Sequence, residues 1–237
     1  MPQPTFAHPP ISPQSIDSNA RWSHLASTIF QNISTDRGLP HPIATAVHES
    51  QDGFLWVGTQ GGLSRWDGYR FRTYLPDPKD LHSLPDVWIQ AMHTDSRGRM
   101  WVATYEGGLA RYNPQFDNFE RVPIGPGGLS HASVSALADD GDGGIYIGTD
   151  GGLDQYTPDT GGMRHWQFDP NDAQSLPDNH IYALLREKNG TLWIGTGRGL
   201  VRRQPGSAQF ERVALPVASE QAVIVRTLAL ASGGNYP

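Results

Sequence analysis

The side chains best suited to ligand chemistry are polar and aromatic residues that fall between the apolar strand-like segments of the chain. They are Asp86, Trp88, Tyr105, His131, Asn179, His180 and Arg198. Aromatic faces with carboxylate and amide groups beside them are a common way to hold sugars. This mixture therefore predicts a small-molecule or oligosaccharide ligand. The alternative for each residue is an ordinary solvated position in a loop.

The pattern gives less support to catalytic or metal chemistry. The chain has nine histidines, but neither His-x-His nor His-Glu-x-x-His spacing occurs. The acidic run Asp139–Gly143 resembles half of a calcium loop without the carboxylate that completes it. We therefore predict no catalytic residue, no metal site and no cofactor. His48 and His93 share one repeat position and are interpreted as structural.

Charge and hydropathy exclude several partners. The net charge is -6 and no run of lysine and arginine occurs, so nucleic-acid binding is not expected. No apolar run reaches the 18 or more residues that a membrane helix needs. The N-terminus lacks the features of a secretory signal. Any membrane contact is therefore expected to come from segments outside this sequence, and the absence of cysteine fits an oxidising compartment.

A four-fold repeat organises the chain. Its copies are Phe54–Thr59, Arg99–Thr104, Gly144–Thr149 and Thr191–Thr196, and their aromatic positions are separated by 45, 45 and 47 residues. That period is typical of four-stranded propeller blades. Asp-Gly or Asn-Gly turns precede most copies, and glycine-rich turns follow all of them. The apolar runs hardly alternate with polar residues, which indicates strands covered on both faces.

The repeat predicts an all-β fold, a β-propeller with blades at about 43–74, 89–122, 134–167 and 181–213. Residues 28–33 read as an isolated outer strand that closes a ring, and residues 222–237 as the start of a fifth blade. We expect the chain to be a fragment with four complete blades. Residues 1–27 are rich in proline, serine and glutamine and are expected to be a disordered leader.

In this arrangement the candidate residues gather at one rim of the central channel. Asp86, Trp88, His131, Asn179 and His180 lie in loops that precede inner strands. Tyr105 and Arg198 lie in the second turns of their blades. The arginines and tryptophans that recur on strands are expected to be structural instead, through pairing between blades or packing. They are Arg65, Arg111, Arg202, Trp56, Trp101 and Trp193.

Residues 52–67 and 189–202, together with the spacers 77–85 and 169–177, resemble the two-component regulator propeller repeat. The resemblance implies paired seven-bladed propellers in the periplasm, an immunoglobulin-like domain, a membrane helix and a cytoplasmic histidine kinase or diguanylate cyclase. It also implies carbohydrate sensing in some members. Departures from the repeat occur at packing positions, namely Ala103, Glu106, Tyr146 and Arg203.

Three functions are compatible with these features. The first is a non-catalytic, ligand-sensing propeller of a membrane-anchored bacterial signalling protein, located in the periplasm, with other blades and domains of the parent protein as partners and a dimer expected. The second is a stand-alone propeller enzyme such as a streptogramin-type lyase, in which His131 or His180 would act with a metal at the axis. The third is a scaffold whose rim binds another protein.

Overall fold

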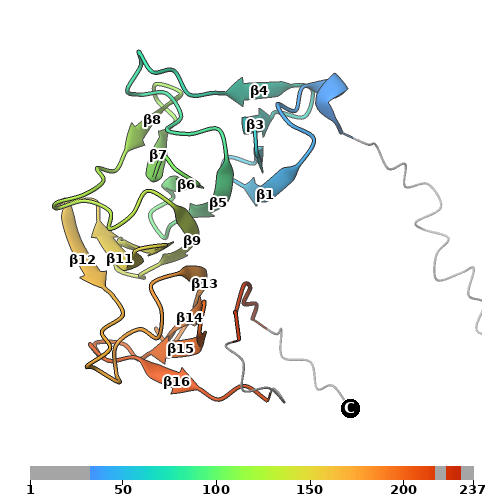
Figure 1. The fold of residues 1–237 in the computed structure, drawn as a ribbon. Helices are drawn as coiled ribbons and strands as arrows, with labels where there is room; N and C mark the ends of the chain where they lie inside the picture. The colour runs from blue at the N-terminus through green and yellow to red at the C-terminus, as the bar shows by residue number, and fades with distance from the viewer. Residues whose placement is uncertain (1–32, 217–222, 231–237) are drawn as a thin grey trace, which may run out of the picture. The chain divides into compact units, whose positions relative to one another are not determined.

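The computed structural model describes residues 33–216 and 223–230, and their regular secondary structure is almost entirely antiparallel β-sheet (Figure 1). The predicted leader and residues 28–32 of the predicted outer strand lie outside the described residues. A short 3-10 helix, Thr35–Arg37, precedes the first strand. No helix in the described ranges is long and apolar enough to cross a membrane.

The described residues form four sheets of four strands, each in the order of the chain. The first blade contains β1 (Ala44–Glu49), β2 (Leu55–Thr59), β3 (Gly62–Trp66) and β4 (Phe71–Tyr74). The second contains β5 (Ile89–Thr94), β6 (Met100–Thr104), β7 (Leu109–Asn113) and β8 (Asn118–Arg121). The third contains β9 (Val134–Asp139), β10 (Ile145–Thr149), β11 (Gly152–Thr157) and β12 (Gly162–Trp166). The fourth contains β13 (Ile181–Arg186), β14 (Leu192–Thr196), β15 (Gly199–Arg203) and β16 (Glu211–Val213). The prediction of an all-β chain built from four-stranded blades is confirmed.

Consecutive blades pack face to face. The inner strands β1, β5, β9 and β13 lie next to one another in that order (Figure 1). Each of three buried apolar clusters joins two successive blades. One fully buried leucine of each spacer belongs to each cluster, namely Leu84, Leu129 and Leu176. Burial contributes roughly 25 cal/mol per Å² of apolar surface, so the junctions between blades supply much of the stability.

The second strand of a blade approaches the next blade most closely at a glycine. A Cβ atom at Gly58 would lie 2.6 Å from Ile89 Cγ2, and one at Gly148 would lie 2.6 Å from Ile181 Cγ2. The second blade has Ala103 at this position, and the residue that corresponds to Ile89 in the third blade is the smaller Val134. Because one side chain is larger and the other smaller, this junction keeps a similar packed volume.

The two ends of this stack differ. Residues 223–230, where a fifth inner strand is predicted, contain no strand, yet the Val225 N–H donates to the Thr196 carbonyl at 3.1 Å and Val225 packs on Gly195. At the other end, Val47 on β1 is 65% exposed. Its counterparts Met92, Leu137 and Leu184 pack against the cluster shared with the preceding blade. Val47 is therefore exposed where its counterparts are packed, although its cross-strand partner Val57 on β2 is buried.

Candidate functional site

Three of the predicted rim residues form a compact group in the second blade. The rings of Trp88 and Tyr105 lie 4.6 Å apart at 31°, and the Tyr105 N–H donates to the Trp88 carbonyl at 3.0 Å. Asp86 accepts hydrogen bonds from the N–H groups of Val87, at 2.7 Å, and Glu106, at 3.0 Å. Tyr105 is 40% exposed. The group presents an aromatic surface with a carboxylate beside it.

A second group lies at the start of the fourth blade. Asp178 accepts hydrogen bonds from the His180 N–H at 2.9 Å and from His180 Nδ1 at 2.9 Å, and Arg198 Nε is 3.6 Å from its other oxygen. Burial alone would raise the pKa of Asp178, but the hydrogen bonds from His180 and the charge of Arg198 outweigh it and lower that pKa. The Asn179 side-chain oxygen accepts from the Phe168 N–H at 2.7 Å, so Asn179 orders the neighbouring spacer.

His131 belongs to neither group. Its Nδ1 accepts a hydrogen bond from the Ser133 N–H at 3.0 Å, and its Cβ lies beside Gly151. Within the described ranges, no group of three or more His, Asp or Glu side chains is placed to hold a metal ion. The structure therefore brings Asp86, Trp88 and Tyr105 together and joins His180 to Arg198 through Asp178, whereas the Asn179 and His131 side chains bond to backbone groups outside both groups.

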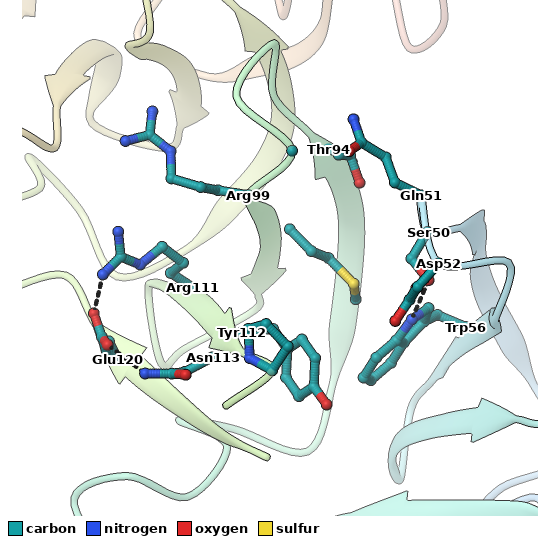
Figure 2. A pocket seen from close by; sticks show the side chains of 13 residues that line it. Ser50, Gln51, Asp52, Trp56, Thr94, Arg99, Arg111, Tyr112, Asn113 and Glu120 are labelled. Atoms are coloured by element: carbon teal, nitrogen blue, oxygen red, sulfur yellow. Dashed lines mark hydrogen bonds and ion pairs between the residues drawn. The ribbon is translucent and has the colours of Figure 1, made fainter. Parts of the chain in front are cut away.

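A cavity that the sequence did not predict lies between the first two blades (Figure 2). It has a volume of about 450 Å³ and opens among the turns that follow β1, β5 and β7. These turns lie at the opposite end of the strands from the predicted rim, because neighbouring strands are antiparallel. Trp56, Met100 and Tyr112 supply its apolar surface.

The polar side chains around this cavity are already paired. Arg111 forms an ion pair with Glu120, which also accepts from Asn113 Nδ2 at 2.9 Å (Figure 2). The hydrogen bond from Arg111 lowers the pKa of Glu120. Trp56 Nε1 donates to Ser50 Oγ at 3.1 Å. Since the charges are balanced, the cavity suits a neutral molecule with an apolar face.

At the next junction the equivalent turns are joined by ion pairs. There Arg97 and Arg99, from the turn after β5, both form ion pairs with Asp159, and Arg99 also donates to the Gly143 carbonyl at 2.6 Å. The first blade has Asp52 where the second has Arg97. The third blade also has an acid at this position, Asp142, so this substitution alone would not have indicated the open space.

Asp117 joins the first two blades. Its Oδ1 accepts from the hydroxyls of Tyr74 and Tyr112 at 2.6 Å each and lies 3.3 Å from Arg65, and its Oδ2 lies 2.5 Å from Arg72. Burial would raise the pKa of Asp117, but the two hydroxyls and the two arginines outweigh that effect and lower it. Burial and the hydrogen bond to Asp117 raise the pKa of Tyr74 and Tyr112.

Comparison with known proteins supports the repeat. The profile of the family described as "Two component regulator propeller" matches residues 83–106, 128–151 and 175–198. This chain carries the two-component regulator propeller repeat. Each matched segment runs from the spacer leucine through the inner strand and second strand to the turn that follows. The match therefore covers the first two strands of each of these blades and the rim loops beside them.

Solved structures share the fold. The extracellular domain of BT4673 from B. thetaiotaomicron, described both as a one component and as a hybrid two component system, is 24% identical with a TM-score of 0.64. That match covers 81% of this chain and 25% of the other. Virginiamycin B lyase from Staphylococcus aureus is 14% identical with a TM-score of 0.57, covering 74% and 56% of the two chains. The predicted β-propeller is confirmed.

One relative is a much longer protein than this chain. Histidine kinase P4 of Formosa agariphila is 32% identical over 56 residues, which are 24% of this chain and 4% of that protein. The chain thus spans a small part of this relative and about a quarter of the BT4673 domain.

Proposed function

We propose that this chain is a non-catalytic, ligand-sensing propeller module of a membrane-anchored bacterial signal-transduction protein, either a sensor kinase or a diguanylate cyclase. The matched repeat supports this proposal, as do the histidine kinase and the extracellular propeller domain that resemble the chain. The module would lie on the periplasmic side of the inner membrane, and the output domain would belong to another part of the parent protein.

The observation that best supports a sugar ligand is the Trp88–Tyr105 pair beside Asp86. The apolar face of a sugar ring can stack on such rings, while the carboxylate accepts hydrogen bonds from hydroxyl groups. The Asp178, His180 and Arg198 group offers further donors at the same end of the strands, in loops of the same kind. An oligosaccharide long enough to reach more than one loop is the ligand class we expect.

The partners would include other blades of the parent protein. The exposed Val47 on β1 stands at the position where the later blades have Met92, Leu137 and Leu184 packed against the preceding blade. A further blade from the parent protein would cover it in the same way. We also expect the complete protein to be a dimer.

Calorimetric titration of the purified chain with neutral oligosaccharides tests the ligand proposal. A Trp88→Ala variant should bind about 5- to 30-fold more weakly, since stacking and burial of one aromatic ring are worth roughly 1–2 kcal/mol. Tyr69, which is 92% exposed on the first blade, supplies the matched control Tyr69→Ala. Absence of binding by the chain, or equal binding by both variants, would count against a sugar site at this rim.

The alternative function is a propeller lyase, which the Asp178–His180 pair favours because a carboxylate orients the imidazole. Incubation with virginiamycin B, followed by chromatography of the products, tests it. Turnover that His180→Ala abolishes would establish the enzyme. An unchanged substrate would leave the sensor proposal in place.

A further inference from the structure

One cross-strand pair in the first blade breaks the pattern of the repeat. In the second blade Arg111 lies opposite Glu120, and in the fourth Arg202 lies opposite Glu211, with an ion pair in each case. In the first blade Arg65 lies opposite Arg72. Like charges directly opposite each other on antiparallel strands are destabilising. The first blade therefore has two adjacent guanidinium groups, where the second and fourth blades have an ion pair and the third has Gln155 opposite Arg164.

Asp117 from the next blade compensates these charges only in part. Its single carboxylate contacts both Arg65 and Arg72. Asp117 has a φ of 53°, whereas the same turn position in the third blade is Gly161 with a φ of 69°. A residue other than glycine in this region costs roughly 1–2 kcal/mol. Aspartate is one of the few residues other than glycine that adopt this conformation, and here its carboxylate is held against both arginines.

A hollow of about 310 Å³ adjoins these arginines. Arg65, Asp67, Arg70, Phe71 and Arg72 line it. The side chain of Arg70 is 87% exposed and its Nε lies 3.6 Å from Asp67, while the Arg72 side chain is 59% exposed. Three guanidinium groups thus face two carboxylates, Asp67 and Asp117. The hollow is locally positive in a chain whose net charge is -6.

Several donors at this hollow remain available. Asp67 Oδ1 is occupied by the N–H groups of Tyr69 and Arg70, at 2.9 Å each. In the described structure, Arg72 contacts Asp117 through one terminal nitrogen, and Arg70 contacts Asp67 through Nε. The other N–H groups of these two side chains can reach a ligand. Guanidinium forks match the oxygen spacing of oxyanions and form two parallel hydrogen bonds with them.

We propose that this hollow on the first blade is an oxyanion site, which binds a phosphate or sulfate group that is either free or carried on a larger molecule. Arg70 and Arg72 would hold the oxygens, the partly buried Arg65 would add positive charge, and Asp117 would bridge Arg65 and Arg72 and offset their repulsion when the site is empty. A tetrahedral dianion fits better than a carboxylate, because it offers more oxygens and more charge to three guanidinium groups. This site is independent of the rim and of the proposed sugar ligand.

Calorimetry at low, constant ionic strength with inorganic phosphate, glucose 6-phosphate and glucose tests the proposal. Phosphate and glucose 6-phosphate should bind in a saturable way, and glucose should not bind at this site. Arg72→Gln and Arg70→Ala should each weaken phosphate binding by about tenfold or more, as loss of a charge-assisted hydrogen bond predicts. Arg164→Gln is the matched control, because Arg164 holds the same repeat position in the third blade.

The results of this experiment distinguish free phosphate from an organic phosphate as the ligand. Equal affinity for phosphate and glucose 6-phosphate would identify the anion alone as the ligand, and tighter binding of glucose 6-phosphate would identify an organic phosphate. No saturable phosphate binding, unchanged binding in Arg70→Ala and Arg72→Gln, or an equal loss in Arg164→Gln would overturn the proposal. Arg70 makes so few contacts that Arg70→Ala will fold, which keeps the test decisive if Arg72→Gln does not.

Discussion

The close approach of Gly58 to Ile89 leads to a sharp prediction about how the blades are held together. A Cβ atom at position 58 would lie 2.6 Å from Ile89 Cγ2 and 2.8 Å from Ile89 Cβ. Both distances are shorter than atoms at a packed interface tolerate, and Ile89 is fully buried. Overpacking of this kind costs about 1–3 kcal/mol, so we expect Gly58→Ala to lower the free energy of unfolding by that amount.

A double-mutant cycle separates this clash from a general effect of alanine. Ile89→Ala alone should cost about 2–5 kcal/mol, because it leaves a cavity. In the Gly58→Ala background it should cost less, since it removes the Cγ2 atom that clashes, with a coupling energy of about 0.5–3 kcal/mol.

Urea denaturation followed by tryptophan fluorescence measures all four proteins of the cycle. Gly148→Ala, at the equivalent junction with Ile181, should repeat the loss seen for Gly58→Ala. If the effects of Gly58→Ala and Ile89→Ala are additive, or if Gly58→Ala is neutral, the contact between these two residues does not limit blade packing and the reasoning fails.

Two further predictions concern charge. Burial lowers the pKa of His48 and His93, so the unfolded chain binds more protons than the folded chain once the pH falls below about 6.5. The free energy of unfolding should therefore be constant above about pH 7 and decline as the pH falls from 6.5 to 5. If urea titrations of a His93→Gln variant show the same decline as the unaltered chain, the prediction is wrong. The Asp117→Ala variant should be less stable than Asp117→Gly by about 1 kcal/mol, because glycine adopts the positive φ of this turn without steric cost. Thermal melts that give the reverse order of stability would show that the turn is unstrained.

The sequence determined the blades because their signals are local and repeated. A strand with a glycine at its closest point, flanked by Asp-Gly and Gly-Gly turns every 45 residues or so, can bury both faces only by stacking on copies of itself. The four sheets follow from that pattern. Their rim loops were also predictable, because a loop must follow where a strand ends, and seven side chains could be assigned to these loops.

Which of those side chains meet depended on the tertiary structure. Asp178 contacts both His180 and Arg198, whereas His131 hydrogen-bonds within its own loop. The conformation of each loop decides which side chains come into contact, and this conformation cannot be read from the residue types alone. The rim assignments themselves stay predictions until a ligand is measured.

The junctions between blades show most clearly that the sequence does not reveal which side chains meet. Asp117 reaches Arg65 and Arg72 across more than 40 residues of sequence, and the cavity beside Trp56 is lined by turns from two different blades. A repeat shows which positions are equivalent, but it does not show which departures face one another across a junction. The sequence by itself therefore determined the blade and its order of strands, while only the packing of one blade on the next decided where charge and empty space accumulate.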